Sequence, residues 1–222
     1  METETSAHQR IGLFGGTFNP VHIGHLRCAE EIREKFALSR IVFVPAFMPP
    51  HKKEPTAPAH HRCEMVRLAI EGNPCFGLSD IEIRRRGNSY SHDTIEHFRS
   101  REFPGAEIFF IIGSDAFREV HTWRRYPEFF EHCGFIVMSR AGSSPVSPFA
   151  LSGIAAEMFM RLDENTYEHS SGTRICCAAV SALDISSTDI RERISGGRTI
   201  SYLVTQPVER YILENRLYRQ PE

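Results

Sequence analysis

The sequence predicts an α/β fold: a doubly wound, mostly parallel sheet with helices on both faces. Short apolar runs of β-prone residues recur along the chain, and helical patterns lie between most of them. Alternation of this kind favours parallel strands that are covered on both faces. Ligands of such sheets collect at the carboxyl ends of the strands. The predicted strands are residues 11–14, 41–45, 76–83, 108–112, 135–138 and 174–180.

The predicted helices are recognised by apolar residues spaced three and four apart. One such stripe follows each of the first three strands: Leu26, Ala29, Ile32 and Phe36, then Met65, Leu68 and Ala69, then Ile95 and Phe98. Further helices are expected around residues 149–161 and over residues 208–213. Two loops interrupt the pattern, a basic one with five prolines at residues 45–59 and a Gly/Ser/Pro-rich one at residues 141–148.

Composition excludes several broad classes of function. The 222 residues carry a net charge of -2 at pH 7, which gives no sign of a nucleic-acid surface. No apolar run is long enough to span a membrane, and the polar residues 1–10 lack the apolar core of a secretory signal. The six cysteines have no C-x-x-C pair, so we expect reduced thiols, no structural metal and a cytoplasmic protein. Nucleic acid and membranes are not expected as partners.

The most informative segment, residues 15–25, follows the first predicted strand. Its first two residues, Gly15 and Gly16, allow a sharp turn and a close approach of the backbone to a ligand. Asn19 and Pro20 are expected as the N-cap and the first residue of a helix, with His22 and His25 on one face of the opening turn. Free N–H groups and two imidazoles at a helix N-terminus suit a polyphosphate. Neither of the two commonest nucleotide-binding loop patterns is present.

A second capped helix is predicted at residues 186–191. Three consecutive hydroxyl side chains supply N-caps, and Asp189 is placed to complete a capping box with Ser186. Capping alone accounts for these hydroxyls. Arg191, one turn further on, adds a forked donor with a charge that does not titrate away.

Together these motifs resemble the signature of the nucleotidyltransferase superfamily, and within it the bacterial nicotinate-nucleotide adenylyltransferases of NAD biosynthesis. The resemblance implies a Rossmann-like fold. We expect residues 1–9 to form a flexible tail and residues 10–220 a single nucleotidyltransferase domain that includes the helical segment at residues 185–191. The other segments that carry the resemblance are residues 49–52, 89–91 and 112–115 and Trp123.

The family resemblance also implies a reaction. The adenylyl group of ATP is transferred to nicotinate mononucleotide, which gives deamido-NAD and pyrophosphate by direct in-line attack with no covalent enzyme intermediate. Because both reactants are anionic, the protein must align them and stabilise charge on the transferred group. Mg²⁺, bound mainly through the ATP phosphates and water, is the expected cofactor.

The residues that match the family's catalytic positions are His22, His25, Lys52 and Arg191. The two histidines are expected to donate hydrogen bonds to the ATP phosphates, and Lys52, next to His51, to belong to a loop that closes over substrate phosphate. Arg191 is expected to grip the phosphates from the side opposite the histidines. The expected ATP-binding residues are Gly15, Gly16, Thr17, Phe18, Gly113, Asp115, Ser187 and Thr188.

Four residues are expected to bind nicotinate mononucleotide. Tyr90 and Ser91 resemble a family Tyr-Thr loop whose backbone N–H groups face the nicotinate carboxylate, and such donors disfavour a carboxamide. Ser91 keeps the hydroxyl of the family threonine but loses its methyl group. Trp123, the only tryptophan, offers a stacking face for a pyridinium ring or fills a half-buried core position. Arg140 follows a strand and is expected to reach the nucleotide.

Other readings of the sequence stay open. The acceptor could be nicotinamide mononucleotide, or phosphopantetheine as in a shorter related family. A nucleotide-binding regulatory protein could keep the pocket without turnover. A zinc module built on His22, His25 and Cys28 is the weakest alternative. The sequence leaves open whether the chain forms a homo-oligomer.

Overall fold

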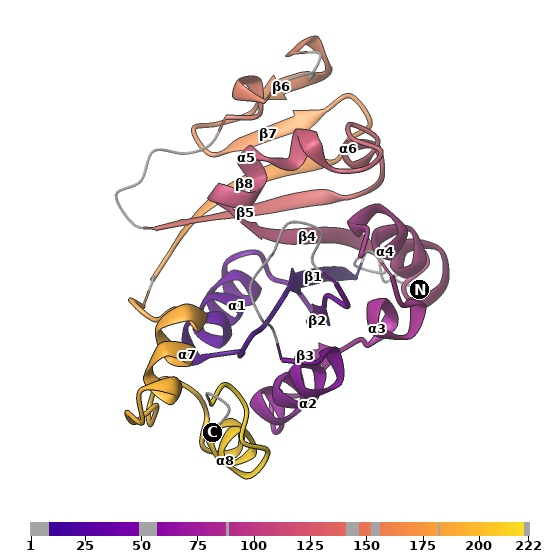
Figure 1. Ribbon diagram of the computed structural model, residues 1–222. Helices are drawn as coiled ribbons and strands as arrows, with labels where there is room; N and C mark the ends of the chain where they lie inside the picture. Colours follow the sequence, from indigo (N-terminus) through magenta and orange to yellow (C-terminus); the bar gives the residue numbers. More distant parts are fainter. Residues whose placement is uncertain are drawn as a thin grey trace, which may run out of the picture. The chain divides into compact units, whose positions relative to one another are not determined.

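The computed structural model describes residues 9–48, 57–87, 89–140, 147–151, 156–181 and 183–219. The strands of this described part form one sheet in the order β3-β2-β1-β4-β5-β8-β7-β6 (Figure 1). They are β1 (Arg10–Gly16), β2 (Arg40–Pro45), β3 (Phe76–Leu78), β4 (Glu107–Gly113), β5 (Gly134–Arg140), β6 (Phe159–Arg161), β7 (Thr166–His169) and β8 (Arg174–Val180). The predicted Rossmann-like α/β fold with a mostly parallel sheet is confirmed.

The helices follow the strands much as the apolar stripes predict. The α-helices are α1 (Ile23–Lys35), α2 (Ala59–Ile70), α3 (Ile81–Arg85), α4 (Ser91–His97), α5 (Ser114–Arg118), α6 (Phe129–His132), α7 (Ser187–Ser195) and α8 (Gln206–Glu214). A π-helical turn, Phe98–Glu102, continues α4. Single 3₁₀ turns occur at Val120–Thr122, Pro148–Ala150 and Ala156–Met158. No helix among the described residues has the length and apolar character needed to cross a membrane.

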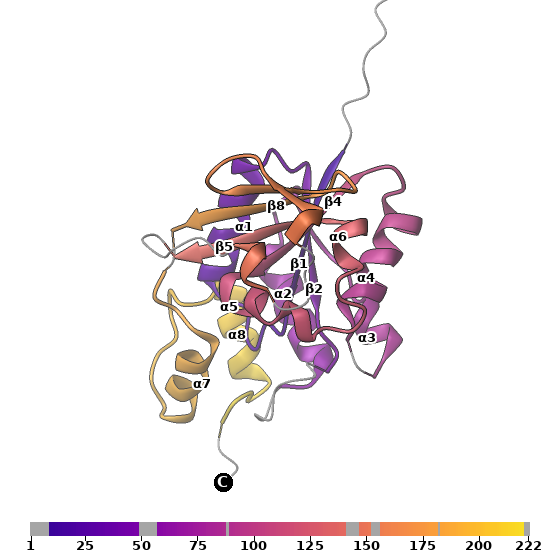
Figure 2. The ribbon, with the colours of Figure 1, turned by 90° about the horizontal axis from the view of Figure 1, so that it is seen from above.

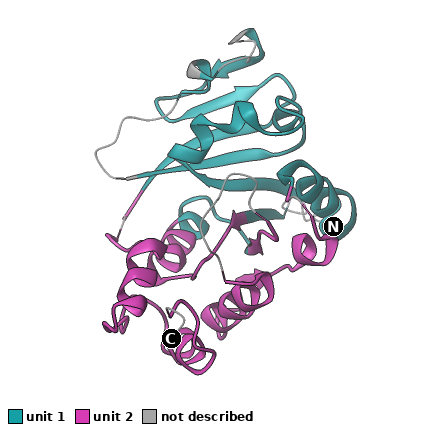
Figure 3. Cartoon of the chain, viewed as in Figure 1, with its two compact units in different colours: residues 1–13, 32–41, 90–179 teal, residues 14–31, 42–89, 180–222 magenta. Residues whose placement is uncertain are grey.

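The chain divides into two compact units (Figure 3). Unit 1 comprises residues 1–13, 32–41 and 90–179, and unit 2 comprises residues 14–31, 42–89 and 180–222. A single domain over residues 10–220 stays a prediction. Of the predicted tail, residues 1–8 lie outside the described part.

Unit 1 combines parallel and antiparallel strand pairs. β4 and β5 are parallel, with Phe109 opposite Gly134 and Gly113 opposite Met138, and the arrows of β5 and β8 point the same way (Figure 2). β7 is antiparallel to both β8 and β6. Phenylalanine rings fill the core of this unit, and Phe135 contacts Phe130 at a centroid distance of 5.2 Å and Phe117 at 5.8 Å.

Unit 2 has its own aromatic core beside two packed helices. The Phe43 ring lies 5.4 Å from that of Phe14 and 5.2 Å from that of Phe76. α2 packs against α8, where His61 Nδ1 lies 2.8 Å from the Tyr211 hydroxyl. The predicted C-terminal helix is therefore confirmed as α8 and has a packing partner.

Two segments of the chain have a different type of secondary structure from the one that the sequence predicts. The run at residues 76–83 is a strand only over β3, because Asp80 then begins α3 and pairs with Arg84 one turn later at 2.7 Å. The helix expected around residues 149–161 is wrong, since this stretch ends in β6, which pairs with β7. The turn between them is closed by Asn165, whose N–H donates to Asp163 Oδ1 at 2.7 Å. An Asx turn of this kind favours a hairpin over a helix.

A glycine in β5 gives a direct test of the packing in unit 1. A Cβ on Gly134 would lie 2.7 Å from the Phe109 ring and 3.0 Å from the Arg174 carbonyl oxygen, and the backbone oxygen cannot easily move. We expect Gly134→Ala to lower the free energy of unfolding by about 1–3 kcal/mol, as overpacking does. Gly113→Ala is the matched control, because nothing lies within 4 Å of its added Cβ. Equal urea midpoints for the two variants would contradict the packing described here.

Candidate active site

The signature segment of unit 2 turns tightly between β1 and α1. Phe18 adopts a left-handed backbone conformation, with φ at 48°, and its side chain is 2% exposed. A Cβ on Gly16 would lie 2.8 Å from the Phe18 ring, so only glycine fits there without a shift. The Phe18 ring packs on Phe14 and on His25. Of the predicted ATP-binding residues, Phe18 therefore has its side chain in the core, and only its backbone can face a ligand.

The expected start of the first helix is wrong, because α1 begins at Ile23 and not at Pro20. Asn19 lies in a turn and is 4% exposed. Its Oδ1 accepts hydrogen bonds from the backbone N–H of Ala57 at 3.1 Å and from the Tyr218 hydroxyl at 2.9 Å. The side chain that would cap a helix is therefore used to bind two other segments of unit 2.

The predicted pairing of His22 and His25 is confirmed. Their rings lie 3.7 Å apart at an angle of 32°. The His22 N–H donates to His25 Nδ1 at 3.2 Å, so the neutral His25 ring carries its hydrogen on Nε2. Gly24 makes room for the pair, since a Cβ there would lie 3.0 Å from His22 Nδ1.

Burial sets the charge of His22. The side chain is 8% exposed, and its Nδ1 has no hydrogen-bond partner among the described residues. Desolvation by burial lowers the pKa of His22 from 6.5 to about 4. The ring is therefore neutral at pH 7, and it offers one N–H donor and no positive charge.

The predicted second helix N-terminus is confirmed as α7. The Ser186 side chain accepts a hydrogen bond from the Asp189 N–H at 3.0 Å, while the Asp189 carboxylate pairs with Arg193 at 2.7 Å. Only the first half of the capping box therefore forms. Three other bonds shape this turn: Ser187 Oγ donates to Pro20 O at 2.9 Å, Arg191 Nη1 to Asn19 O at 3.0 Å, and Arg191 Nη2 to Thr188 Oγ1 at 3.2 Å. Two of them tie the start of α7 directly to the signature turn.

Sequence reasoning missed Arg62 on α2. Its side chain is 1% exposed, and its guanidinium donates to three carbonyl oxygens: Thr17 at 2.7 Å, Phe47 at 2.8 Å and Ala57 at 3.0 Å. Burial lowers the pKa of Arg62. The sequence did contain a sign of this burial. Arg62 stands four residues before Val66, so both lie on the apolar face of α2, and both are buried. An arginine at a core position of a helix indicates a charge that is satisfied inside the protein.

Unit 1 carries the expected acceptor-binding residues. Tyr90 precedes the first residue of α4, Ser91, and the Arg124 guanidinium lies 4.7 Å from the centre of the Tyr90 ring. Trp123 is half-buried, with its indole edge-on to Phe110 at 6.0 Å and to Phe129 at 5.9 Å. These contacts fix the indole plane. They are compatible with a stacking face and with a packing role.

The remaining predicted residues lie at or just after the ends of strands, or outside the residues that the structure describes. Gly113 ends β4, and Asp115, in the first turn of α5, has a fully exposed carboxylate 3.2 Å from Arg118 Nη1. Arg140 ends β5, and its side chain is outside the described atoms. Lys52 and His51 also lie outside the described residues.

A family model described as cytidylyltransferase-like matches residues 13–193. The chain belongs to the cytidylyltransferase-like family. Among curated members it is similar to a probable nicotinate-nucleotide adenylyltransferase of Pelobacter propionicus, with 48% identity over 95% of this chain and 99% of that one. A second relative of the same name, from Geobacter metallireducens, is 46% identical over 94% of this chain and 98% of that one.

Solved structures agree on the fold of this cytidylyltransferase-like chain. The Plasmodium falciparum nicotinic acid mononucleotide adenylyltransferase complexed with NaAD superposes with a TM-score of 0.71, at 18% identity, over 95% of this chain and 98% of that one. At so low an identity the likeness concerns the fold alone. The two histidines of the signature lie within the segment that the family model matches.

The buried neutral His22 predicts how stability depends on pH. Because its pKa is lower in the folded state than in the unfolded state, the unfolded chain binds more protons between pH 6.5 and 4. His22 therefore favours the folded state fully above pH 6.5, and this contribution is lost as the pH falls towards 4, by up to about 3 kcal/mol. We expect His22→Gln to flatten the pH dependence of urea unfolding in this window. The exposed His60→Gln is the control, and an unchanged slope in His22→Gln would contradict the assignment.

Arg62 predicts a large loss of stability on a conservative change. In Arg62→Lys a single ammonium cannot reach three carbonyls set for a planar fork, so we expect unfolding to become easier by about 3 kcal/mol. Arg67→Lys, on the same helix but about half exposed and paired with Glu64, should change stability by less than about 0.5 kcal/mol. Similar urea midpoints for both variants would show that the buried fork is dispensable.

Proposed function

We propose that this chain transfers the adenylyl group of ATP to nicotinate mononucleotide, and so releases pyrophosphate and forms deamido-NAD. The geometric observation that carries the proposal is the pairing of His22, just before α1, with His25, in its first turn. The two rings pack together, and the His22 N–H donates to His25 Nδ1. It sets His25 Nε2–H as a donor at a helix N-terminus, where anions bind. The near full-length similarity to relatives named nicotinate-nucleotide adenylyltransferase supports the choice of reaction.

The roles that we assign in unit 2 are electrostatic. The attacking phosphate oxygen is already deprotonated near pH 7, so the reaction needs no general base from the protein. His25 and neutral His22 donate hydrogen bonds to the phosphates of ATP, and the Thr188 hydroxyl and the charge of Arg191 add to them. Ser187, whose hydroxyl hydrogen goes to Pro20 O, contributes its backbone N–H at the start of α7. Such donors accelerate transfer where they bind the transition state more strongly than the ground state. Lys52 completes the catalytic set in this proposal.

Mg²⁺ is the cofactor that we propose, carried by the ATP phosphates. The donors of the signature turn and of α7 are imidazoles, hydroxyls and a guanidinium, which all suit phosphate oxygens and include no carboxylate of the kind that usually holds Mg²⁺. The residues therefore fit an ion that keeps water and phosphate ligands. When bound, Mg²⁺ neutralises phosphate charge.

In unit 1 we assign the acceptor to Tyr90, Ser91 and Trp123. The indole of Trp123 stacks on the pyridinium ring, and backbone N–H groups at Tyr90 and Ser91 face the carboxylate. Gly113 and Asp115 contact the ATP nucleoside, and Arg140 contacts the acceptor nucleotide. The compartment that we propose is the cytoplasm. All six cysteines are free thiols, which agrees with a cytoplasmic enzyme.

Pyrophosphate release with ATP and Mg²⁺ tests the substrate. We expect kcat/KM for nicotinate mononucleotide to exceed that for nicotinamide mononucleotide by roughly 10²-fold, because carboxylate-facing N–H groups oppose a carboxamide. Comparable values of kcat/KM would overturn the assigned selectivity, while adenylyl transfer would stand as the reaction. No release with either acceptor would overturn the proposed substrate, and phosphopantetheine would then be the next acceptor to try.

His25→Ala separates an enzyme from a nucleotide-binding regulator. Loss of a transition-state donor should lower kcat by about 10²-fold or more, with a smaller change in the KM for ATP. The control is His97→Ala in α4, whose imidazole pairs with Glu102. A variant that loses only affinity for ATP while kcat stays unchanged would contradict the role given to His25.

A further inference from the structure

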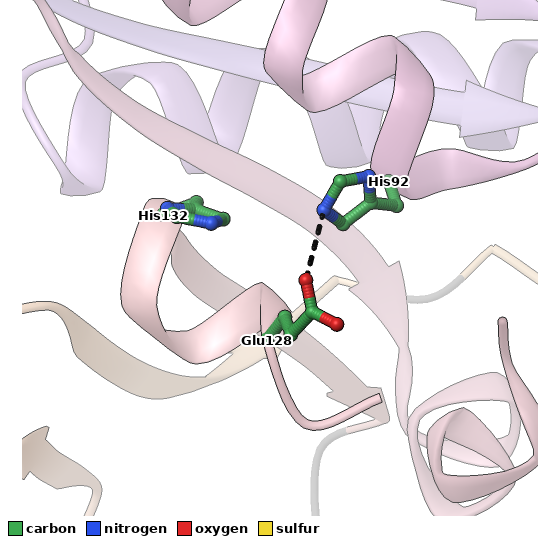
Figure 4. Close-up of side chains that lie close together, drawn as sticks. All are labelled: His92, Glu128 and His132. Atoms are coloured by element: carbon green, nitrogen blue, oxygen red, sulfur yellow. Dashed lines mark ion pairs between the residues drawn. The ribbon is translucent and has the colours of Figure 1, made fainter. Parts of the chain in front are cut away.

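Unit 1 holds a cluster of two imidazoles and a carboxylate that the proposed function does not use. It consists of His92 on α4, Glu128 just before α6 and His132 at the end of α6 (Figure 4). One potential ligand atom from each residue lies within 4.8 Å of the other two. His92 Nε2 faces the carboxylate, 3.7 Å from Glu128 Oε2. Three metal-ligating side chains from separate turns of the chain therefore converge on one point.

His92 lacks the partners that a buried imidazole normally has. Its side chain is 7% exposed, and neither ring nitrogen makes a hydrogen bond to any described residue. The nearest carboxylate oxygens lie at 3.6 Å, on Asp93, and at 3.7 Å, on Glu128, beyond hydrogen-bonding distance. Buried polar groups are almost always satisfied by a partner, water or an ion. The orphaned nitrogens thus point to a missing ligand.

We propose that His92, Glu128 and His132 bind a divalent transition-metal ion of the Zn²⁺ type. Two imidazoles and one carboxylate are a common zinc ligand set, with a water in the fourth position. Tetrahedral bonds of about 2.0–2.1 Å place ligand atoms roughly 3.4 Å apart. The 3.7 Å between His92 Nε2 and Glu128 Oε2 is close to this, and no pair of ligand atoms is more than 4.8 Å apart, so binding would draw the three side chains together by at most about 1.4 Å. Mg²⁺ does not fit, because it prefers oxygen ligands.

Two arginines contact the proposed ligands. Arg125 Nη2 lies 2.6 Å from Glu128 Oε2, and Arg99 Nη1 lies 2.7 Å from His132 Nδ1. Both arginine side chains are about half exposed, at 49% and 48%, so they can turn into solvent at low cost. An arginine N–H and a metal ion compete for the same imidazole lone pair. Arg99 therefore weakens the site, and its removal should strengthen binding.

The ion would add a bond between α4 and α6, which already meet at the Phe129 ring and, through the π-helical turn that continues α4, at the contact between Arg99 and His132. The Phe129 ring contacts His92 at 5.9 Å and Trp123 at 5.9 Å. A metal bond between α4 and α6 would hold this ring stack in place and favour the folded form of unit 1. The site goes beyond the proposed function and does not depend on it.

Competition for Zn²⁺ with a chromophoric chelator tests the site on the untagged 222-residue chain in excess Mg²⁺. We expect each chain to bind one Zn²⁺ ion in competition with the chelator. Glu128→Gln and His132→Gln should each bind Zn²⁺ at least about tenfold more weakly. Because the Glu128 side chain is 40% exposed, we expect its replacement to leave the core of unit 1 intact. His97→Gln, which changes an imidazole of α4 outside the cluster, should bind normally, and Arg99→Gln should bind more tightly.

Co²⁺ in place of Zn²⁺ gives an independent readout. We expect visible absorption typical of a tetrahedral nitrogen–oxygen site in the wild type, and its loss in Glu128→Gln and in His132→Gln. If the chain binds no Zn²⁺ in competition with the chelator, the proposal is overturned. Binding that survives in both variants but is lost in His25→Ala or Cys28→Ser would also overturn it, because the ion would then be held by unit 2.

Discussion

The buried guanidinium of Arg62 is the interaction on which the candidate site of unit 2 depends. It donates to carbonyl oxygens in the signature turn (Thr17), after β2 (Phe47) and before α2 (Ala57). None of these carbonyls belongs to a helix or a strand ladder, so each needs another donor once it is buried. A planar fork with five N–H groups meets this need in one side chain. The cost of burying its charge is offset by charge-assisted bonds to all three segments.

The arrangement of the phosphate-binding candidates follows from that constraint. With Thr17 held by Arg62 and Asn19 held by Ala57 and Tyr218, the signature turn is fixed before a nucleotide arrives. The turn presents His22 and His25 as a closely packed pair of rings, and burial keeps the first of them neutral. Preorganised donors of this kind need little rearrangement as charge develops, which is how electrostatic catalysis lowers a barrier.

The sequence predicted elements whose signal is local and periodic. The apolar stripes of α1 and α8 and the Ser186 cap of α7 could be predicted because spacing and cap chemistry act within one turn. The β6–β7 hairpin was missed because its strands are short and the Asp163 turn outweighs the apolar pattern. Asn19 was taken for a cap because its tertiary partners Ala57 and Tyr218 are distant in sequence. Arg62 was missed for the same reason: its three acceptors cannot be identified from spacing alone.

Hydrogen exchange of backbone amides in Arg62→Met most directly tests the claim that this side chain holds the signature turn. We expect protection to fall in residues 17–25 far more than in β8, where residues 174–179 lie in unit 1. The matched variant Arg67→Met should leave both regions unchanged. Equal loss of protection in the turn and in β8 would mean that Arg62 stabilises the fold only globally. No loss in the turn would mean that the signature segment keeps its geometry without Arg62, and would contradict the holding role of this side chain.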